Sequence, residues 1–169
     1  MIVLGVDPGT VHTGWGVVEA RGARVLGLAA GVIDADARAE LPERLAAIHD
    51  GLAQVIAEHG PGCMAVEDVF VKHARSALVL GHARGVILLT GRAAGLEITA
   101  YSPAVVKRSV AGRGAADKAQ LGRIVAAMLG LRELPRADAT DALAIAITHA
   151  HALRVPAAMR SPRGRARRR

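Results

Sequence analysis

The stretch that decides the fold is Ile2-Val3-Leu4-Gly5-Val6-Asp7, which is followed at once by the turn-forming pair Pro8-Gly9. Its apolar residues do not alternate with polar ones, and this is typical of a strand that is buried on both faces. A strand of this kind belongs inside a sheet that carries helices on each side. The stretch therefore predicts an α/β fold, with Asp7 leaving the strand at the edge of the sheet.

The rest of the chain adds strands and helices in an order typical of one mixed sheet. The predicted strands after the first are residues 14–20, 24–33, 63–67 and 97–101. The predicted helices begin at Pro42, at residue 74, in a short helical turn at Ser102-Pro103, at Asp117 and at about Ala139. The second and third strands are close enough to form a hairpin, so we predict a three-strand antiparallel meander plus two parallel strands, flanked by helices.

Charge is spread unevenly along the 169 residues, which carry a net charge of +7. Residues 154–169 contain seven arginines and no acid, whereas the rest of the chain has equal numbers of basic and acidic side chains. The length fits a single domain, which we expect over residues 1–155, followed by a basic, disordered tail over residues 156–169. An arginine-rich tail favours nucleic acid as the partner, although it could also act only as a solubilising segment.

The composition also excludes several classes of protein. No apolar run approaches the roughly 20 residues that cross a bilayer, and the N-terminal stretch lacks the basic region of a signal peptide. The single cysteine, Cys63, allows neither an intrachain disulfide nor a cysteine-based zinc site. We therefore expect a cytoplasmic protein that makes no contact with a membrane.

Acidic side chains stand where several predicted elements begin or end. Asp7 and Glu67 close two short buried strands, whose carboxyl ends would share one edge of the sheet. Asp68 points to the opposite face of its strand, so we assign Glu67 to the site. Asp138 and Asp141 are three residues apart, which puts them on one face at the start of the last helix. Each acid also has a structural explanation: a turn for Asp7, solvent exposure for Glu67, and N-capping for Asp138.

The convergence of these four acids favours a metal site over separate structural roles. Carboxylates a few Å apart raise one another's pKa values, and a bound cation relieves their repulsion. Oxygen ligands without cysteine favour Mg²⁺ or Mn²⁺ over zinc, and a two-ion site is suited to phosphodiester hydrolysis. The histidines show no comparable ligand pattern, and we expect these on the surface or on helices: His12, His49, His82, His149 and His151.

Three motifs give the acids a family resemblance. They are Leu4-Gly5-Val6-Asp7-Pro8-Gly9-Thr10 with Thr13-Gly14, Ala65-Val66-Glu67-Asp68-Val69-Phe70, and Ala137-Asp138-Ala139-Thr140-Asp141-Ala142-Leu143-Ala144. Together with Ser76-Ala77-Leu78, Gly81, Ala83-Arg84-Gly85 and the spacing of Lys107 and Lys118, they resemble the RuvC family of crossover-junction endodeoxyribonucleases. The motifs occur in family order from residue 1 to about residue 151, and the arginine-rich tail is not covered.

The resemblance implies a ribonuclease H-like fold and a homodimer that resolves four-way (Holliday) DNA junctions by paired symmetric nicks, in recombination and DNA repair. It implies that the catalytic and metal-binding acids are Asp7, Glu67, Asp138 and Asp141, with two Mg²⁺ or Mn²⁺ ions per subunit. Some family members have a histidine in place of the first acid of the final pair, so the role of Asp138 is less fixed than that of Asp141. A further implied partner is the branch-migration helicase complex of RuvA and RuvB.

The resemblance also suggests which residues bind DNA. Lys107 and Lys118 match basic residues that meet the DNA backbone, and Phe70 matches an aromatic position near the junction bases. Arg113, in the basic loop over residues 111–114, is a further candidate. Each lysine could instead be a solvated surface residue, and Phe70 could belong to the core. The helix over residues 74–94 could form the dimer interface or could pack only within the monomer.

Three other functions share parts of this pattern. An ATPase of the actin and sugar-kinase type has a similar phosphate loop, but it closes two such domains around its nucleotide, and this chain has room for one. A nuclease-like protein that processes RNA precursors would share the fold and the acids. A noncatalytic nucleic-acid-binding module would bind its ligand without cutting it when metal is added.

Overall fold

The computed structural model describes residues 1–68, 74–112 and 117–154. Its sheet has five strands in the order β3-β2-β1-β4-β5. The strands are β1 (Ile2–Asp7), β2 (His12–Arg21), β3 (Arg24–Asp34), β4 (Cys63–Glu67) and β5 (Glu97–Tyr101). Strand β2 pairs antiparallel with both β1 and β3, whereas β4 runs parallel to both β1 and β5. The predicted meander plus two parallel strands is confirmed, and β1 lies at the centre of the sheet.

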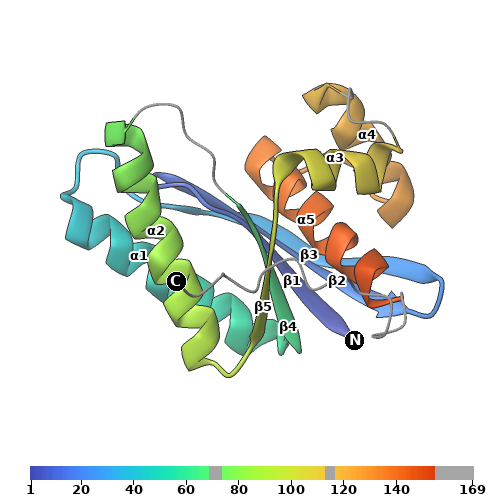
Figure 1. Ribbon diagram of the computed structural model, residues 1–169, viewed down its shortest axis with the longest axis horizontal. Coiled ribbons are helices and arrows are strands. Elements are labelled where there is room, and N and C mark those ends of the chain that lie inside the picture. Colours follow the sequence, from blue (N-terminus) through green and yellow to red (C-terminus); the bar gives the residue numbers. More distant parts are fainter. Residues whose placement is uncertain (69–73, 113–116, 155–169) are drawn as a thin grey trace, which may run out of the picture.

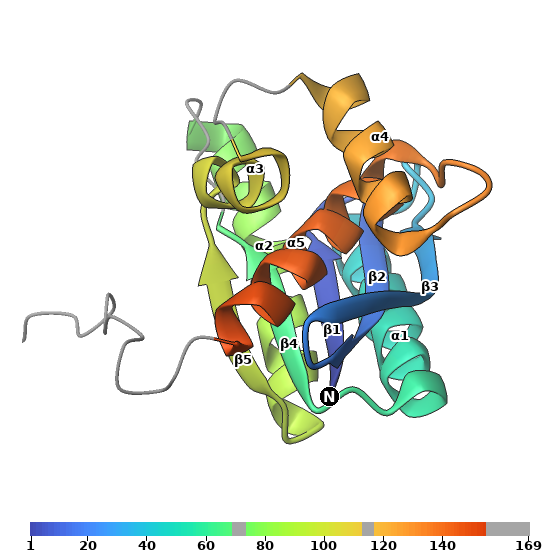
Figure 2. The same cartoon turned by 90° about the vertical axis from the view of Figure 1, so that its right-hand side faces the viewer.

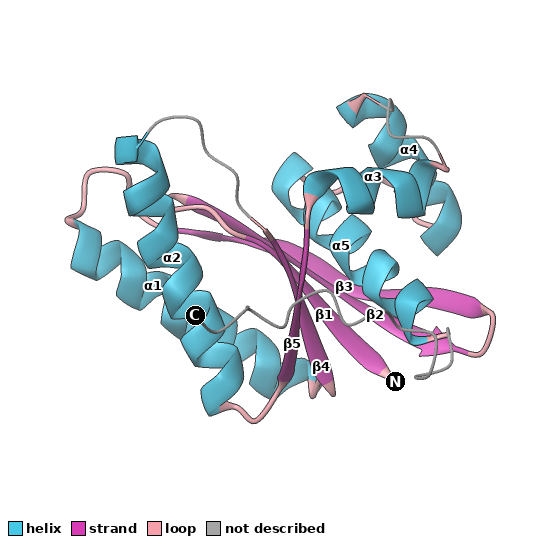
Figure 3. Ribbon diagram, viewed as in Figure 1, coloured by secondary structure: helices cyan, strands magenta, loops and turns pink. Residues whose placement is uncertain are grey.

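Helices cover both faces of this sheet. They are α1 (Leu41–His59), α2 (Ala74–Ala93), α3 (Pro103–Ala111), α4 (Lys118–Leu129) and α5 (Ala137–Leu153). Helices α1 and α2 lie on one face, and α5 lies across the other with α3 and α4 beside it (Figures 1 and 2). Figure 3 shows the resulting three layers, with the sheet between the two groups of helices. None of the helices in the described ranges is both long enough and apolar enough to cross a membrane.

Helix α3 is longer than the sequence suggested. A short helical turn was expected at Ser102-Pro103, but the helix continues for nine residues to Ala111. Pro103 starts it with a fixed φ, and Gly112 ends it in the left-handed region at φ 68°. Its inner face buries Val106 and Val110 in the core, which explains why the helix extends beyond one turn.

The core consists of two apolar layers, one on each face of the sheet. Val3 packs in the layer beneath α5, whereas Leu4 and Val6 pack in the layer beneath α1 and α2. All three side chains are fully buried, as the unbroken apolar run of β1 predicts. Because both faces of β1 are covered, the strand is held in place, and so is the backbone of its last residue, Asp7.

Helix α5 lies unusually close to the sheet because glycines form the surface beneath it. A Cβ atom on Gly16 would lie 2.9 Å from the backbone nitrogen of Leu143. A Cβ on Gly5 or Gly14 would overlap the carbonyl oxygens of Ala142 and Asp138, respectively. The three glycines of β1 and β2 therefore allow the backbone of α5 to rest directly on the backbone of the sheet.

Candidate active site

The predicted acids come from three elements that meet at one end of the sheet. Asp7 ends β1, Glu67 ends β4, and both Asp138 and Asp141 lie near the start of α5. Strands β1 and β4 are parallel neighbours in which the residues just before these two acids are paired. Asp7 and Glu67 therefore leave the sheet side by side, at the carboxyl ends of the strands.

The start of α5 is brought to the same place by Gly14. This glycine pairs with Asp7 across the β1–β2 ladder. It also lies directly beneath the backbone of Asp138, with no room between them for a side chain. One glycine thus connects the strand that carries the first acid to the helix that carries the last two.

The acids border a cavity of about 310 Å³ between the strand ends and helices α3, α4 and α5. Its lining residues are Asp7, Glu67, Pro103, Val106, Lys107, Lys118, Leu121 and Asp141. Asp138 is not part of this lining, but its charge acts on Asp7. The structure thus brings together three of the four predicted acids and both predicted lysines, and it leaves Asp138 beside them.

Asp7 has the most strongly perturbed carboxyl of the site. Burial raises its pKa from 3.8 to about 7, and the negative charges of Glu67, Asp141 and Asp138 add to this effect. The Lys118 ammonium acts in the opposite direction. A carboxyl with a pKa near neutrality lies in an environment that disfavours its charge unless a cation compensates it.

Glu67 and its neighbour Asp68 point in different directions, as expected for consecutive residues at the end of a strand. Burial raises the pKa of Glu67, and the charge of Asp141 raises it further. Asp68 instead accepts a hydrogen bond of 3.2 Å from Nη2 of Arg84, on helix α2. The carboxylate in the cavity is therefore that of Glu67.

Two lysines supply positive charge to the cavity. Lys118 is the first residue of α4, after the N-cap Asp117, and its Nζ lies 3.3 Å from Oδ2 of Asp141. The nearby carboxylates raise the pKa of Lys118, with Asp141 as the largest cause. Lys107, on α3, lowers the pKa of Glu67 from across the cavity. Both lysines thus line the cavity with the acids, and the side chain of Lys118 is 81% exposed to an anion from outside.

The donor set fits a hard divalent cation. The ligands available are carboxylate oxygens at one end of the sheet, and a cation would relieve the repulsion that raises the pKa of Asp7. Within residues 1–68, 74–112 and 117–154, however, no three histidine, cysteine, aspartate or glutamate side chains are drawn together tightly enough to hold an ion as they stand. One of the carboxylates, that of Asp141, is instead paired with the Lys118 ammonium.

The structure bears on several expectations about single residues. Asp138 is not the N-cap of its helix, because Arg136 takes that position and Asp138 lies in the first turn. His149 lies on helix α5, in agreement with the expectation that the histidines lie on the surface or on helices. It is only 7% exposed, and its Nδ1 lies 2.8 Å from the hydroxyl oxygen of Tyr101. Phe70 and Arg113, both proposed to bind DNA, lie outside the described residues, as does the tail over residues 156–169.

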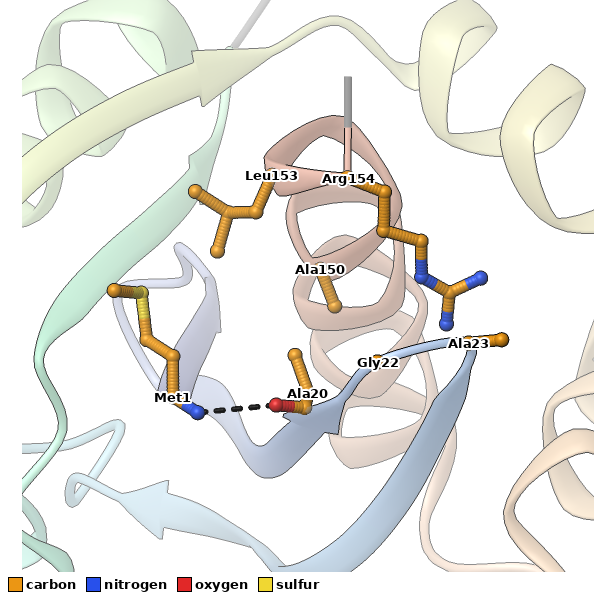
Figure 4. Close-up of a pocket in the computed structure, with 7 residues that line it drawn as sticks. All are labelled: Met1, Ala20, Gly22, Ala23, Ala150, Leu153 and Arg154. Atoms are coloured by element: carbon orange, nitrogen blue, oxygen red, sulfur yellow. Dashed lines mark hydrogen bonds between the residues drawn. The ribbon is translucent and has the colours of Figure 1, made fainter. Parts of the chain in front are cut away.

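A second pocket, of about 610 Å³, lies near the opposite end of β1 from Asp7. Figure 4 shows its lining residues: Met1, Ala20, Gly22, Ala23, Ala150, Leu153 and Arg154. The terminal amine of Met1 donates a hydrogen bond of 3.0 Å to the carbonyl oxygen of Ala20, which also lines the pocket. The side chains that line this pocket are mainly apolar and include no carboxylate, so it lacks the groups that hydrolysis requires.

Comparisons with known proteins agree with this geometry. A family model described as crossover junction endodeoxyribonuclease RuvC matches residues 3–149. The relative from Sorangium cellulosum is 51% identical over 94% of this chain and 89% of its own length, and the relative from Azorhizobium caulinodans is 46% identical over 94% of each. Both carry the name crossover junction endodeoxyribonuclease RuvC.

Solved structures give the same result. The Thermus thermophilus RuvC in complex with a Holliday junction substrate is 38% identical, with a TM-score of 0.86 over 91% of this chain and 95% of its own. The yeast mitochondrial Holliday junction resolvase Ydc2 is 14% identical with a TM-score of 0.63, which shows a common fold alone. The ribonuclease H-like fold is therefore confirmed, and the chain belongs to the RuvC family of crossover junction endodeoxyribonucleases.

Proposed function

We propose that this protein resolves four-way DNA junctions by paired, symmetric phosphodiester hydrolysis that depends on Mg²⁺ or Mn²⁺, in recombination and DNA repair. The observation that carries the proposal is the cavity in which three carboxylates face two lysines. Carboxylates can hold hard cations, and ammonium groups attract a phosphate backbone. The names of the relatives and the junction bound by the Thermus protein support DNA as the substrate.

Asp7, Glu67 and Asp141, with Asp138 beside them, would hold the ions. When bound by these residues, divalent cations would supply Lewis-acid chemistry for phosphodiester hydrolysis, and cleavage would leave 5′-phosphate and 3′-hydroxyl ends. The carboxylates act as ligands. Burial raises the pKa values of Asp7 and Glu67, and repulsion from neighbouring carboxylates raises them further. Lys107 and Lys118 orient the phosphate and supply the salt-dependent part of binding.

Phe70 and Arg113 complete the proposed DNA-binding set. Phe70 follows closely after Glu67, where an aromatic ring could stack on a base that has left its pair. Arg113 follows helix α3, which also carries Lys107. The proposal assigns no metal-binding role to either residue.

A homodimer suits this substrate because an isologous pair presents two identical sites to a junction that has its own two-fold axis. Helix α2 supports this part of the proposal. Leu78 and Leu89 are 64% and 68% exposed, and their spacing of three helical turns puts them on one face. Gly81 and Gly85 lie between them, and a Cβ at either would meet open space. This exposed stripe of α2 is the surface that we assign to the partner subunit.

The setting of the activity follows from the family. We place the enzyme in the cytoplasm, in agreement with its single, buried cysteine. The branch-migration complex of RuvA and RuvB is proposed as a partner on the basis of family membership alone.

The proposal can be tested with an immobile four-way DNA junction and a linear duplex of the same sequence. We expect symmetric paired nicks in the junction alone with Mg²⁺ or Mn²⁺, and none in chelator. Glu67→Gln should abolish cleavage, because it removes a ligand charge from the cavity. Asp68→Asn is the matched control, because this neighbouring carboxylate bonds Arg84 instead, and it should cleave like the wild type.

Three results would contradict parts of the proposal. Binding of the junction without cutting under either metal would indicate a noncatalytic module. Preferential cutting of structured RNA would indicate a processing nuclease on the same fold. Loss of activity in Asp68→Asn with activity retained in Glu67→Gln would show that the two neighbouring carboxylates have been assigned wrongly.

A further inference from the structure

A cluster of three side chains connects the antiparallel meander to the start of helix α5. Nη1 of Arg136 lies 2.6 Å from Oδ2 of Asp34, and Nδ1 of His12 lies 2.7 Å from Oδ1 of the same carboxylate. His12 is the first residue of β2, Asp34 the last residue of β3 and Arg136 the N-cap of α5. His12 and Asp34 are also paired across the β2–β3 ladder, so the cluster has a fixed base in the sheet.

The direction of each hydrogen bond follows from the chemistry of the three groups. The Asp34 carboxylate only accepts, so Nδ1 of His12 must carry a hydrogen and donate to it. Nη2 of Arg136 and Nδ1 of His12, which are 3.4 Å apart, are then two donors brought together by one acceptor. Asp34 is therefore the centre of the cluster, and its two partners are held in place through it.

The position of Arg136 is what makes this cluster relevant to the active site. Arg136 stands two residues before Asp138, and the N-cap of α5 makes no side-chain hydrogen bond to the helix backbone. A cation beside the positive end of a helix is unfavourable unless a negative charge compensates it. Asp34 supplies that charge and is the largest cause of the raised pKa of Arg136, to which the charge of Asp138 also contributes.

We propose that His12, Asp34 and Arg136 form a clamp that positions the first turn of α5, and with it Asp138 and Asp141, over the ends of β1 and β4. Gly14 sets how close α5 approaches the sheet. The clamp adds a lateral contact, because it ties the N-cap of α5 to the ends of β2 and β3. Asp34 and Arg136 are thus positioning residues, and this role rests on the proposed function of the acids they position.

The expected signature of the clamp is a loss of turnover without a loss of folding. Both partners of the Arg136–Asp34 pair are about half exposed, and exposed ion pairs contribute little to overall stability. A small displacement of catalytic groups, in contrast, reduces turnover on the order of tenfold to a hundredfold. Clamp variants should therefore melt close to the wild-type temperature and yet cut slowly.

The test compares Asp34→Ala, Arg136→Ala and the double variant in single-turnover junction cleavage. Asp34→Ala should lower the cleavage rate at saturation tenfold or more, with the apparent Kd for the junction changed less than twofold. The double variant should be no slower than the slower single variant, because both remove the same contact. Arg136→Lys keeps the charge near Asp138 and should recover part of the rate. The matched control is Glu19→Ala, which removes another ion pair that involves β2, that of the partly exposed Glu19 with Arg21.

A second readout does not depend on cleavage, namely the rise in melting temperature when Mn²⁺ is added. It should be smaller in Asp34→Ala than in Glu19→Ala, and Asp34→Asn gives a milder version if the alanine variant folds poorly. A wild-type cleavage rate in Asp34→Ala would overturn the clamp. A double variant in which the rate losses of the two single substitutions multiply would overturn it as well. If the wild type itself neither cuts the junction nor responds to Mn²⁺, the proposed function fails instead.

Discussion

Asp7 shows how much of the site depends on one side chain. It ends the central strand, it borders the cavity, and its pKa of about 7 reflects both burial and the charges of the three other acids. The ligand role that we propose for Asp7 and the cost of its charge to stability have the same origin, because the environment that disfavours the lone carboxylate favours a cation beside it. We therefore expect removal of the Asp7 charge to raise the stability of the metal-free protein and to weaken its stabilisation by metal.

The first prediction concerns the metal-free protein. A folded-state pKa of about 7, against 3.8 in the unfolded chain, makes the Asp7 contribution most favourable below pH 4 and removes it as the pH rises through about 7. Asp7→Asn should therefore raise the free energy of unfolding at pH 8 by about 2–4 kcal/mol, since one pKa unit corresponds to about 1.4 kcal/mol. It should change little at pH 4, as measured by urea denaturation in chelator.

The control for this prediction is Asp50→Asn, which replaces an exposed acid of α1 and should have little effect at either pH. With Mn²⁺ the order should reverse, because the wild type would be stabilised by the ion and Asp7→Asn would not. If Asp7→Asn raised the free energy of unfolding equally at both pH values, Asp7 would not lie in a site that disfavours its charge.

Residues differ in how far the sequence alone identified them. Asp7 and Glu67 were identified from the strands they end, and the choice of Glu67 over Asp68 followed from alternation along a strand. The clamp had no such signal, since Asp34 and Arg136 are 102 positions apart and neither belongs to a motif. The Lys118–Asp141 contact was hidden for the same reason, because it depends on how α4 packs beside α5.

At the scale of elements, the local sequence was sufficient to predict a strand or helix where burial or a turn-forming glycine determines its position. The apolar run of β1, the hairpin at Gly22 and the helix closed by Gly60 all agree with the structure. The length of α3 could not be read in this way, because its last turns are stabilised by packing on α5 rather than by their own composition. The glycines of β1 and β2 were visible in the sequence, but their function became apparent only once α5 was placed above them.

The glycine surface gives the second prediction. Gly14→Ala would force a Cβ into the carbonyl of Asp138, and overpacking of this kind costs about 1–3 kcal/mol, with displacement of the helix. We expect a lower melting temperature and, below it, cleavage reduced at least tenfold. Gly27→Ala is the matched control in β3, because its Cβ would meet Leu129 at an ordinary 3.4 Å. If both variants cleaved like the wild type, close seating of α5 would not be needed for activity.

Helix α2 gives the third prediction. Leu89→Glu would place a charge in the exposed stripe that we assign to the dimer interface, so the protein should sediment as a monomer at concentrations where the wild type is a dimer. Junction cleavage should lose its paired symmetry and yield single nicks. Leu134→Glu changes a leucine that is 54% exposed outside α2 and should leave the dimer intact. A dimer in Leu89→Glu would place the interface elsewhere.

At the scale of the whole molecule, the four acids and the excess positive charge lie in separate stretches of the sequence. The family match ends at residue 149, before the arginines of residues 154–169. This separation suggests that the catalytic unit and the basic tail contribute independently. Charged residues outside a catalytic unit add binding energy that depends on salt and not on the sequence of the DNA.

The fourth prediction follows from this separation. Ending the chain after residue 155 should leave the melting temperature and the saturated cleavage rate unchanged, while junction binding weakens. The dependence of log affinity on log salt should become less steep, by up to about one unit for each phosphate that the removed arginines would neutralise. Fluorescence anisotropy at several salt concentrations measures this slope. An unchanged slope would mean that the arginines do not meet the phosphate backbone.

The burial of α5 has a consequence for how the molecule opens. From Ala139 to Ala150 every residue of this helix except Asp141 is buried. Amide hydrogens in such a segment exchange with solvent deuterium only when the whole domain unfolds, whereas those of exposed elements exchange through small local openings. One of the four acids, Asp141, thus lies within this slowly exchanging segment, and Asp138 directly precedes it. On gradual heating, their geometry should persist until the entire domain melts, so that inactivation and global unfolding coincide.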